Sequence, residues 1–332
     1  MTRRWNVLVT GGAGYVGSAL VPELLAAGHR VTVLDLYLYG DDIFAEWDGD
    51  PRLRQVKGDI RDPAAVARAL QGCDCVIHLA CISNDPSYDL DPDLGRSINH
   101  GAFLPLVRAA KAAGVARFIY ASSSSVYGVK DEPEVTEDLP LEPLTDYSKF
   151  KALCERELNA EAAPGFTVCT VRPSTVCGYA RRQRLDVVVN IFTNQAVNNG
   201  KIRVTGGPQK RPNIHIGDMV RVYLHLLQQP DDKIAGKIWN AGDSNYPIAD
   251  LARIVRTVVG EHVEIETVPT NDPRSYHVSG KKIRDDIGFE LKYTIEDAVS
   301  GLVDAMKSGK LVNPLDNPLY FNIKRMQDTR LK

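Results

Sequence analysis

Tyr147 and Lys151 stand four residues apart, downstream of a serine run that spans Ser122–Ser125. On a helix this spacing is about one turn, so the phenol and the ammonium share a face. A free phenol titrates near ~10, but neighbouring positive charge favours phenolate and lowers that pKa. Tyr147 can then accept the proton of a substrate hydroxyl while a serine bonds the same oxygen. These residues predict proton transfer to and from a hydroxyl group.

Three glycines with a regular spacing stand well upstream: Gly11, Gly14 and Gly17. They follow the apolar run Val7–Val9 and open the helical stretch Ser18–Ala27. Glycine is needed where a backbone turns tightly and approaches a pyrophosphate, and a helix N-terminus then offers N–H groups to the phosphates. A glycine pattern or a Tyr-x-x-x-Lys pattern alone is weak evidence, but together they reinforce each other. We therefore expect an NAD-dependent oxidoreductase that acts on a hydroxyl group.

Two acids at the ends of apolar runs bear on the cofactor. Asp35 follows Gly17 by 18 residues, close to the spacing of about 20 expected for the acid that binds the adenosine ribose. A carboxylate there repels the 2′-phosphate of NADP, and no Arg or Lys follows within residues 36–40. NAD is the expected cofactor. Asp59 is either a contact to the adenine amino group or the cap of a helix over residues 63–70.

Apolar runs alternate with helical stretches through the first half of the chain. The expected strands are Val7–Val9, Val31–Leu34, Arg54–Val56, Val76–Leu79, Phe118–Ala121 and Thr167–Val171. Near-continuous apolar runs indicate strands buried on both faces of a parallel sheet, and the alternation favours right-handed βαβ crossovers. We expect an α/β fold, with a Rossmann-type doubly wound parallel sheet over residues 1–172.

The pattern changes in the second half. The expected elements are helices over 186–199, 248–259 and 294–307 and strands over 201–205 and 237–239. Residues 173–332 are expected to form a smaller mixed α/β domain over the carboxyl ends of the sheet, with a strand near 237–241 that can return to the first domain. The tail over 313–332 holds two prolines and has weak periodicity, so we expect an extended arm or a loose segment.

Bulk composition excludes several classes of protein. The net charge is −2, which argues against nucleic acid or an anionic membrane as the main partner. No apolar run approaches the ~18 residues of a spanning helix, and the run after the basic start is too short for a signal peptide. A cytoplasmic location is expected.

No metal site is expected. The six cysteines do not form two close pairs, so we expect reduced thiols, with a catalytic Cys177 as the one alternative. His215 and Asp218 are three apart without a third ligand nearby, and we interpret them as residues at a helix entry.

Taken together, these residues resemble the extended short-chain dehydrogenase/reductase family, and within it the NAD-dependent nucleotide-sugar epimerases and dehydratases. The likeness covers nearly the whole chain, at residues 10–17, 78–80, Asn99, 122–128, 147–151, 172–173, 211–215 and 273–276. It implies a small C-terminal domain that binds a nucleoside-diphosphate sugar. It also implies a homodimer formed through helices near 95–113 and 146–160.

The resemblance implies three sets of site residues. The catalytic set is Ser123, Tyr147 and Lys151. The cofactor-binding set is Gly11, Gly14, Tyr15, Val16, Gly17, Asp35, Asp59, Ile60, Leu79, Ala80, Asn99, Tyr147, Lys151 and Pro173. The substrate-binding set is Ser83, Ser124, Thr175, Arg184, Asn190, Arg211 and Arg274, whose arginines can grip two oxygens of a diphosphate with their planar forks.

The reaction depends on the residues after Ser123. The 4,6-dehydratases carry an Asp-Glu or Ser-Glu pair there, which manages the C5 proton and the leaving C6 hydroxyl. Here Ser124 and Ser125 lack that capacity at neutral pH. We expect a nucleotide-sugar epimerase that acts through a transient 4-keto sugar by hydride transfer at C4.

Other reactions remain open. Residues 181–190 resemble GDP-heptose 4-dehydrogenases, so a 4-dehydrogenase or a 4-keto reductase with net redox is the alternative. Thr175 stands where UDP-galactose 4-epimerases usually have Asn, and Cys177 where many relatives have an aromatic residue. A non-catalytic NAD sensor is a third hypothesis, which the intact Ser123, Tyr147 and Lys151 disfavour.

Overall fold

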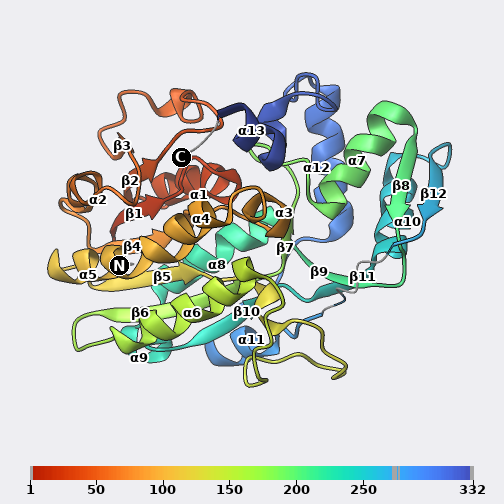
Figure 1. Ribbon diagram of the computed structural model, residues 1–332. Helices are drawn as coiled ribbons and strands as arrows, with labels where there is room; N and C mark the ends of the chain where they lie inside the picture. Colours follow the sequence, from red (N-terminus) through yellow and green to blue (C-terminus); the bar gives the residue numbers. More distant parts are fainter. Residues whose placement is uncertain (1–2, 271–274, 276, 330–332) are drawn as a thin grey trace.

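A seven-stranded parallel sheet forms the centre of the computed structural model, which describes residues 3–270, 275 and 277–329 (Figure 1). Its order is β10-β6-β5-β4-β1-β2-β3. The strands are β1 (Asn6–Thr10), β2 (Arg30–Asp35), β3 (Leu53–Lys57), β4 (Cys75–His78), β5 (Arg117–Ala121), β6 (Thr167–Pro173) and β10 (Ile238–Ala241). The predicted α/β fold with a Rossmann-type sheet is confirmed. The strand order reverses between β1 and β4, where such sheets open a ligand-binding crevice at their carboxyl ends.

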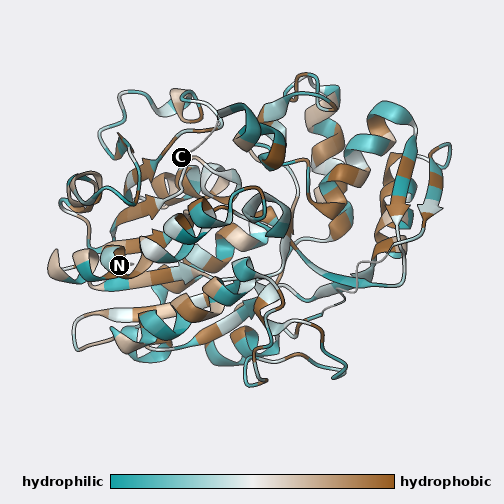
Figure 2. Cartoon of the chain, viewed as in Figure 1, coloured by the Kyte–Doolittle hydropathy of each residue, from teal (hydrophilic) through white to brown (hydrophobic). Residues whose placement is uncertain are grey.

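Helices cover both faces of this sheet (Figure 2, brown strands between helices). One face packs on α1 (Tyr15–Ala26), α8 (Ile216–Gln228) and α11 (Lys281–Ile287). The other packs on α2 (Pro63–Leu70), α5 (Phe103–Ala112) and α6 (Asp146–Ala160). Successive strand residues point to opposite faces, so Val7 and Val9 join the first apolar cluster and Leu8 joins the second. Burial on both faces explains why the inner strands are largely apolar, whereas the edge strand β3 carries Arg54, Gln55 and Lys57.

Short elements complete this half. They are α3 (Asp85–Tyr88), α4 (Pro92–Arg96), α9 (Asp231–Ile234), the 3-10 turns η1 (Ala45–Trp47) and η3 (Ser124–Tyr127), and one π-helical turn, η2 (Ser97–Gly101). The helix expected near 95–113 is therefore a helical run made of α4, η2 and α5.

The second half of the chain builds a separate apolar cluster. Its helices are α7 (Val188–Asn199), α10 (Ile248–Val259) and α12 (Ile295–Lys307), and its strands are β8 (Lys201–Thr205) and β12 (Glu264–Val268). A second small sheet holds β7 (Thr175–Cys177), β9 (Lys210–His215) and β11 (Ser244–Pro247). The chain also returns to the central sheet, where β10 pairs with β6 in parallel. His215 caps α8, as expected for a helix-entry residue, by accepting from the Gly217 N–H.

The C-terminal segment differs from the expected extended or loose arm. It forms a 3-10 turn, η4 (Pro318–Tyr320), and a helix, α13 (Asn322–Thr329), which lies between the central sheet and α12 in Figure 1. The Leu185 N–H donates to the Tyr320 carbonyl at 2.8 Å, and the Asn322 N–H donates to Asp186 at 2.8 Å. The Arg325 guanidinium donates to the Leu38 carbonyl. These contacts come from distant parts of the chain, so local periodicity does not reveal them.

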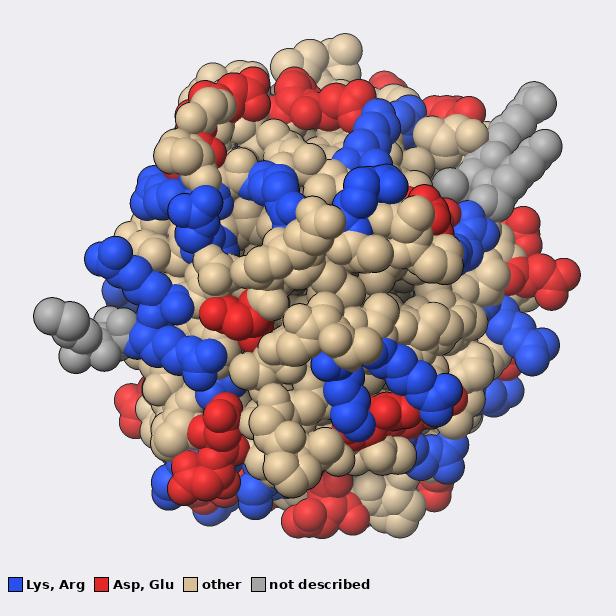
Figure 3. Space-filling view, turned by 90° about the vertical axis from the view of Figure 1, so that its left-hand side faces the viewer, with Lys and Arg blue, Asp and Glu red and all other residues tan. Residues whose placement is uncertain are grey.

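Basic and acidic side chains are interspersed on the face that Figure 3 shows, in keeping with the net charge of −2. Within the described part of the chain, none of the helices combines the length and apolar character needed to span a bilayer.

Candidate active site

A cavity of about 490 Å³ lies at the carboxyl ends of the central strands. Most of the predicted site residues line it: Gly11, Gly14, Tyr15, Val16, Gly17, Asp35, Asp59, Ile60, Leu79, Ala80, Ser83, Ser123, Ser124, Tyr147, Lys151, Pro173, Thr175, Arg184 and Arg211. Residues separated by as much as 200 positions thus share one cavity because they follow the ends of central strands, project from α6 or come from the second half of the chain.

Two predicted residues lie behind the cavity wall. The Asn99 amide accepts from the Ile82 N–H at 2.8 Å and donates to the Ile82 carbonyl at 2.9 Å. Asn190 is fully buried and bonds the backbone of Gly178 and of Arg184. Both amides support neighbouring segments, and neither lines the cavity. A further predicted site residue, Arg274, lies outside the described residues.

The glycine-rich segment forms a wall made of backbone. Gly11 has a φ of +71°, and an added Cβ would stand 2.6 Å from the Ala80 nitrogen. Gly14 is the N-cap of α1, and it contributes no side chain to cap the helix. The first turn also lacks an acidic residue, so its N–H groups have no carboxylate partner within the helix. This wall therefore offers backbone donors and a positive helix end to an anion.

Asp35 stands at the end of β2 with its carboxylate held by backbone donors. The Ala13 N–H donates to one oxygen at 2.9 Å and the Tyr37 N–H to the other at 2.8 Å. Burial raises the pKa of Asp35, and these two hydrogen bonds oppose the rise. The carboxylate is fixed in orientation at the edge of the cavity, as ribose recognition requires.

Asp59 is more engaged than the sequence suggests. Arg61 pairs with it at 2.6 Å, and the Arg61 backbone N–H also donates to it. Burial alone would raise the pKa of Asp59, but the hydrogen bonds from Arg61 hold it below its ordinary value. The alternative that Asp59 caps α2 is wrong, because Asp62 accepts from the Ala64 N–H and is the cap.

Ser123, Tyr147 and Lys151 meet at the centre of the cavity. Thr145 begins α6 with a capping box, which places Tyr147 in the first turn. The Lys151 ammonium donates to the Ala121 carbonyl at 2.7 Å and lies 5.9 Å from the centroid of the Tyr147 ring. Ser123 caps η3, and its hydroxyl is 2.9 Å from that of Ser125. Strand β5 and helix α6 therefore hold the three side chains together.

The Tyr147 phenol is less acidic than the spacing of Tyr147 and Lys151 predicts. Burial raises its pKa, and the neighbouring Cys81 and Asp85 side chains add to the rise. The charge of Arg184 and a hydrogen bond with Ser123 act in the opposite direction without cancelling the effect. In the protein alone Tyr147 is thus a neutral phenol, and further positive charge is needed to make it a base.

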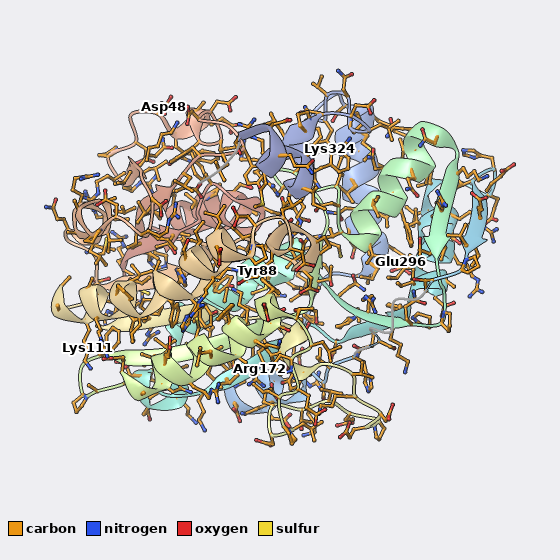
Figure 4. All side chains as sticks on the ribbon, viewed as in Figure 1. Asp48, Tyr88, Lys111, Arg172, Glu296 and Lys324 are labelled. Atoms are coloured by element: carbon orange, nitrogen blue, oxygen red, sulfur yellow. The ribbon has the colours of Figure 1, made fainter. Side chains whose placement is uncertain are left out.

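A buried ion pair between Arg172 and Glu155 stabilises the segment that contains the serine run. Arg172, labelled in Figure 4, bonds both carboxylate oxygens of Glu155 on α6, at 2.7 Å for the closest contact. The Ser122 hydroxyl donates to the same carboxylate. Arg172 also donates to the Tyr127 hydroxyl at 2.8 Å, and Tyr127 donates to Asn240 of β10. These hydrogen bonds connect α6, β6, η3 and β10 beside the serine run.

The cavity also holds residues that sequence reasoning missed. Arg182, Tyr39 and Asn322 line it together, although they come from three separate parts of the chain. Arg182 belongs to an arginine-rich stretch in which only Arg184 stood out, and Asn322 lies in the segment expected to be an arm. Cys177, the alternative nucleophile, is fully buried, and burial raises the pKa of its thiol to about 12, which makes it unreactive.

Comparison with known proteins shows to which family the chain belongs. A model of the "NAD dependent epimerase/dehydratase family" matches residues 7–242. The chain belongs to the NAD-dependent epimerase/dehydratase family. The extended short-chain dehydrogenase/reductase resemblance is thereby confirmed, and NAD is the cofactor.

Individual relatives of this family carry out different reactions. The UDP-glucose 4-epimerase of Lactobacillus helveticus is 26% identical over 317 residues, which cover 89% of this chain and 95% of that protein. The dTDP-glucose 4,6-dehydratase of Streptomyces griseus is 30% identical over 310 residues, 90% of this chain and 93% of that protein. The crystal structure of DesIV, a dTDP-glucose 4,6-dehydratase from Streptomyces venezuelae with NAD bound, has a TM-score of 0.83 at 28% identity and covers 94% of this chain and 100% of that chain.

The residues present fit the NAD of this family. The backbone wall at Gly11 and Gly14 leaves room where a side chain would intrude, and the uncapped start of α1 offers donors to a diphosphate. Asp35 presents a fixed carboxylate at the end of β2. The glycines and α1 would hold the diphosphate, and Asp35 the adenosine ribose.

Proposed function

We propose that this protein is a nucleotide-sugar epimerase that oxidises its substrate at C4 to a transient ketone and reduces that ketone on the opposite face. The observation that carries the proposal is the shared cavity of Ser123, Tyr147 and Lys151 beside the glycine wall. Next to them, Ser124 and Ser125 take the place of the acids that a 4,6-dehydratase uses.

Each catalytic side chain has a distinct task. Ser123 bonds the C4 oxygen and orients it toward Tyr147. Tyr147 removes the proton of the C4 hydroxyl during oxidation and returns it during reduction. When bound, NAD supplies a reversible hydride acceptor at C4 and a positive ring that favours the phenolate form of Tyr147. Lys151 would hold the nicotinamide ribose, and its ammonium adds to the positive charge near the phenol.

The substrate end of the cavity is rich in arginine. Arg184 is held by an ion pair with Asp186 at 2.5 Å and donates to Ser83 at 3.2 Å. Its second terminal nitrogen is buried and has no hydrogen-bond partner among the described residues, so it is available to an acceptor on the substrate. Arg211 lines the same cavity from β9. Two guanidinium groups suit the diphosphate of a nucleotide sugar.

A panel of nucleotide sugars tests this proposal. Purified protein is incubated with UDP-, GDP-, dTDP- and CDP-sugars without added cofactor, and proton NMR follows the sugars while absorbance follows reduction of the nicotinamide. Epimers without net absorbance change support the epimerase. A ketone that accumulates with reduced NAD supports the 4-dehydrogenase alternative, including a GDP-heptose-like substrate, and a 4-keto-6-deoxy product supports a dehydratase. Absence of turnover on the whole panel would leave an NAD sensor.

Tyr147→Phe is the matched variant for this panel. Loss of a positioned acid–base group costs about 10²- to 10⁴-fold in turnover, so we expect a drop of that size. Tyr147 is only one of many expected cofactor contacts, and other residues hold the diphosphate and the adenosine ribose, so the NAD content of the purified protein should stay nearly unchanged. Retained turnover would show that Tyr147 is not the base.

The assembly and location follow the same reasoning. We expect a cytoplasmic homodimer whose interface is formed by helices near 95–113 and 146–160, which cover one face of the central sheet. Light scattering coupled to gel filtration would measure the mass. A mass equal to one chain would contradict the dimer.

A further inference from the structure

Arg182 is a buried cation inside the cofactor cavity. Only 4% of its surface is exposed, and it lines the cavity. Its guanidinium stacks on Tyr39, with 3.4 Å from the Cζ atom to the ring centroid. Its backbone N–H donates to the Ser18 hydroxyl of α1 at 3.1 Å. The backbone of Arg182 is therefore tied to α1, and its side chain packs against the loop that follows β2.

Arg182 forms no ion pair in the described part of the chain, although the charges of Asp186, which pairs with Arg184, and of Asp35 interact with it. One terminal nitrogen donates to the neutral Asn322 amide at 2.5 Å, and the Nε atom is buried without a hydrogen-bond partner. The neighbouring arginines differ, because Arg181 pairs with Glu46 and Arg184 pairs with Asp186, each at 2.5 Å. Burial lowers the pKa of Arg182, and the charge of Arg184 adds to the fall, while Tyr39 and Asp186 oppose it without cancelling it. A buried unpaired charge is costly, so an anionic ligand would stabilise this site.

The neighbours of Arg182 indicate which anion fits. Ser18 belongs to α1, Tyr39 follows β2, and the charge of Arg182 acts on Asp35 at the end of β2. All three belong to the βαβ unit that carries the glycine wall and the ribose-binding acid. By contrast, Arg184 acts on Tyr147, at the reacting end. The anion closest to Arg182 should therefore belong to the dinucleotide.

We propose that Arg182 is a cofactor-binding residue whose guanidinium contacts the diphosphate of bound NAD, and that α13 holds it in place through Asn322. The cofactor would then be gripped from two sides. The backbone N–H groups of α1 bind it from the first half of the chain, and a guanidinium from the second half, backed by the C-terminal helix, binds it from the other. This inference rests on the NAD of the family and is independent of the proposed epimerisation.

Binding measurements on Arg182→Met, which keeps a similar volume without charge, test the proposal. The protein is first stripped of bound nucleotide, and calorimetry then measures NAD, ADP, adenosine, UDP and GDP. A hydrogen bond to a charged group corresponds to about ten- to a hundredfold in affinity. NAD and ADP should weaken by that factor and adenosine should not, because adenosine lacks the diphosphate. Arg181→Met, at the neighbouring exposed ion pair, is the matched control and should leave all affinities unchanged.

The nucleotide-sugar diphosphate has the same chemistry, and the UDP and GDP arms separate the two sources. If UDP or GDP weakens while NAD and ADP do not, Arg182 serves the substrate and the proposal is wrong. Equal loss for adenosine and ADP would also overturn it, because the effect would then not concern phosphate.

Thermal unfolding separates a binding role from a structural one. Asn322 keeps a hydrogen bond from the Tyr39 hydroxyl at 3.1 Å when Arg182 is replaced, so no partner is orphaned. Removing an uncompensated buried charge should then leave the melting temperature of the nucleotide-free protein unchanged or higher. The rise that NAD produces should shrink. A lower melting temperature without NAD, with an unchanged NAD-induced rise, would show that Arg182 only supports the fold.

Discussion

The two walls of the cavity are built from different materials. The part of the wall beside α1 is backbone, with glycines that leave space and an N-cap that offers no side chain to the first N–H groups of the helix. A second part of the wall is made of long side chains from the second half of the chain, Arg182, Arg184 and Arg211. The first wall needs no counter-ion, since its charge is spread over backbone dipoles. The second places full charges in a buried site, and each must be compensated.

The arginines of the cavity wall differ in what compensates their buried charge. Arg184 has a carboxylate partner in the protein, Asp186, and so carries its own compensation. Arg182 has none among the described residues, and its environment favours an incoming anion. Arg172 is paired with Glu155, which also accepts from Ser122, and this pair fixes the scaffold. Arginines that already pair with a carboxylate thus organise the site, whereas Arg182 is available to bind an anion.

The backbone wall should be the less tolerant of the two. In Gly11→Ala the new Cβ meets the Ala80 backbone at 2.6 Å, so the segment must shift. We expect the purified protein to retain less than about a tenth of the normal NAD, because helix N–H groups bind a phosphate only at the right position. NAD released by denaturation and measured by its absorbance checks this.

Gly72→Ala is the matched control for the backbone wall. Gly72 has a φ of +73°, close to that of Gly11, but an added Cβ there meets no atom within 4 Å. It should cost only the strain of a left-handed residue, about 1–3 kcal/mol, and leave NAD content intact. Equal NAD content in the two variants would show that the close approach at Gly11 is not what holds the cofactor.

The two parts of the cavity wall also differ in how well the sequence predicts them. Gly11, Gly14, Asp35 and the strands around them meet local backbone requirements, so residue type and spacing are enough to predict them. The residues of the arginine wall depend on contacts between distant segments. Nothing local to Asn322 indicates that it meets Arg182.

The catalytic set shows an intermediate case. The spacing of Tyr147 and Lys151 predicts that they share a helix face, and they do. The pKa of Tyr147 could not be predicted, because it depends on burial and on the charges of Arg184 and Asp85, which the fold brings in from elsewhere. Identity and spacing can therefore suggest a base, whereas its acidity requires the assembled cavity.

Replacing Arg184 should sharpen the contrast at the reacting end. Its charge lowers the pKa of Tyr147, so Arg184→Gln should raise that pKa further. Because phenolate is the active base, kcat/KM rises with pH, and the rising limb should move to higher pH. At a fixed pH on that limb the rate falls about tenfold for each unit of the shift. Arg181→Gln is the control, and a limb that moves to lower pH would contradict the assigned direction.

The smallest effect is expected for a change at Asn322, which accepts a hydrogen bond from Arg182. Asn322→Ala removes a neutral amide that accepts from Arg182 and donates to Ser83 at 3.0 Å, while the stacking on Tyr39 remains. Loss of a hydrogen bond of this kind corresponds to about two- to tenfold, so NAD should dissociate faster by that factor. Stopped-flow displacement of NAD measures the rate. Asn198→Ala on α7, whose amide bonds Asn194 away from the cavity, is the matched control. If both variants release NAD at the rate of the unaltered protein, α13 does not position Arg182, and the two walls hold the cofactor without help from the C-terminal helix.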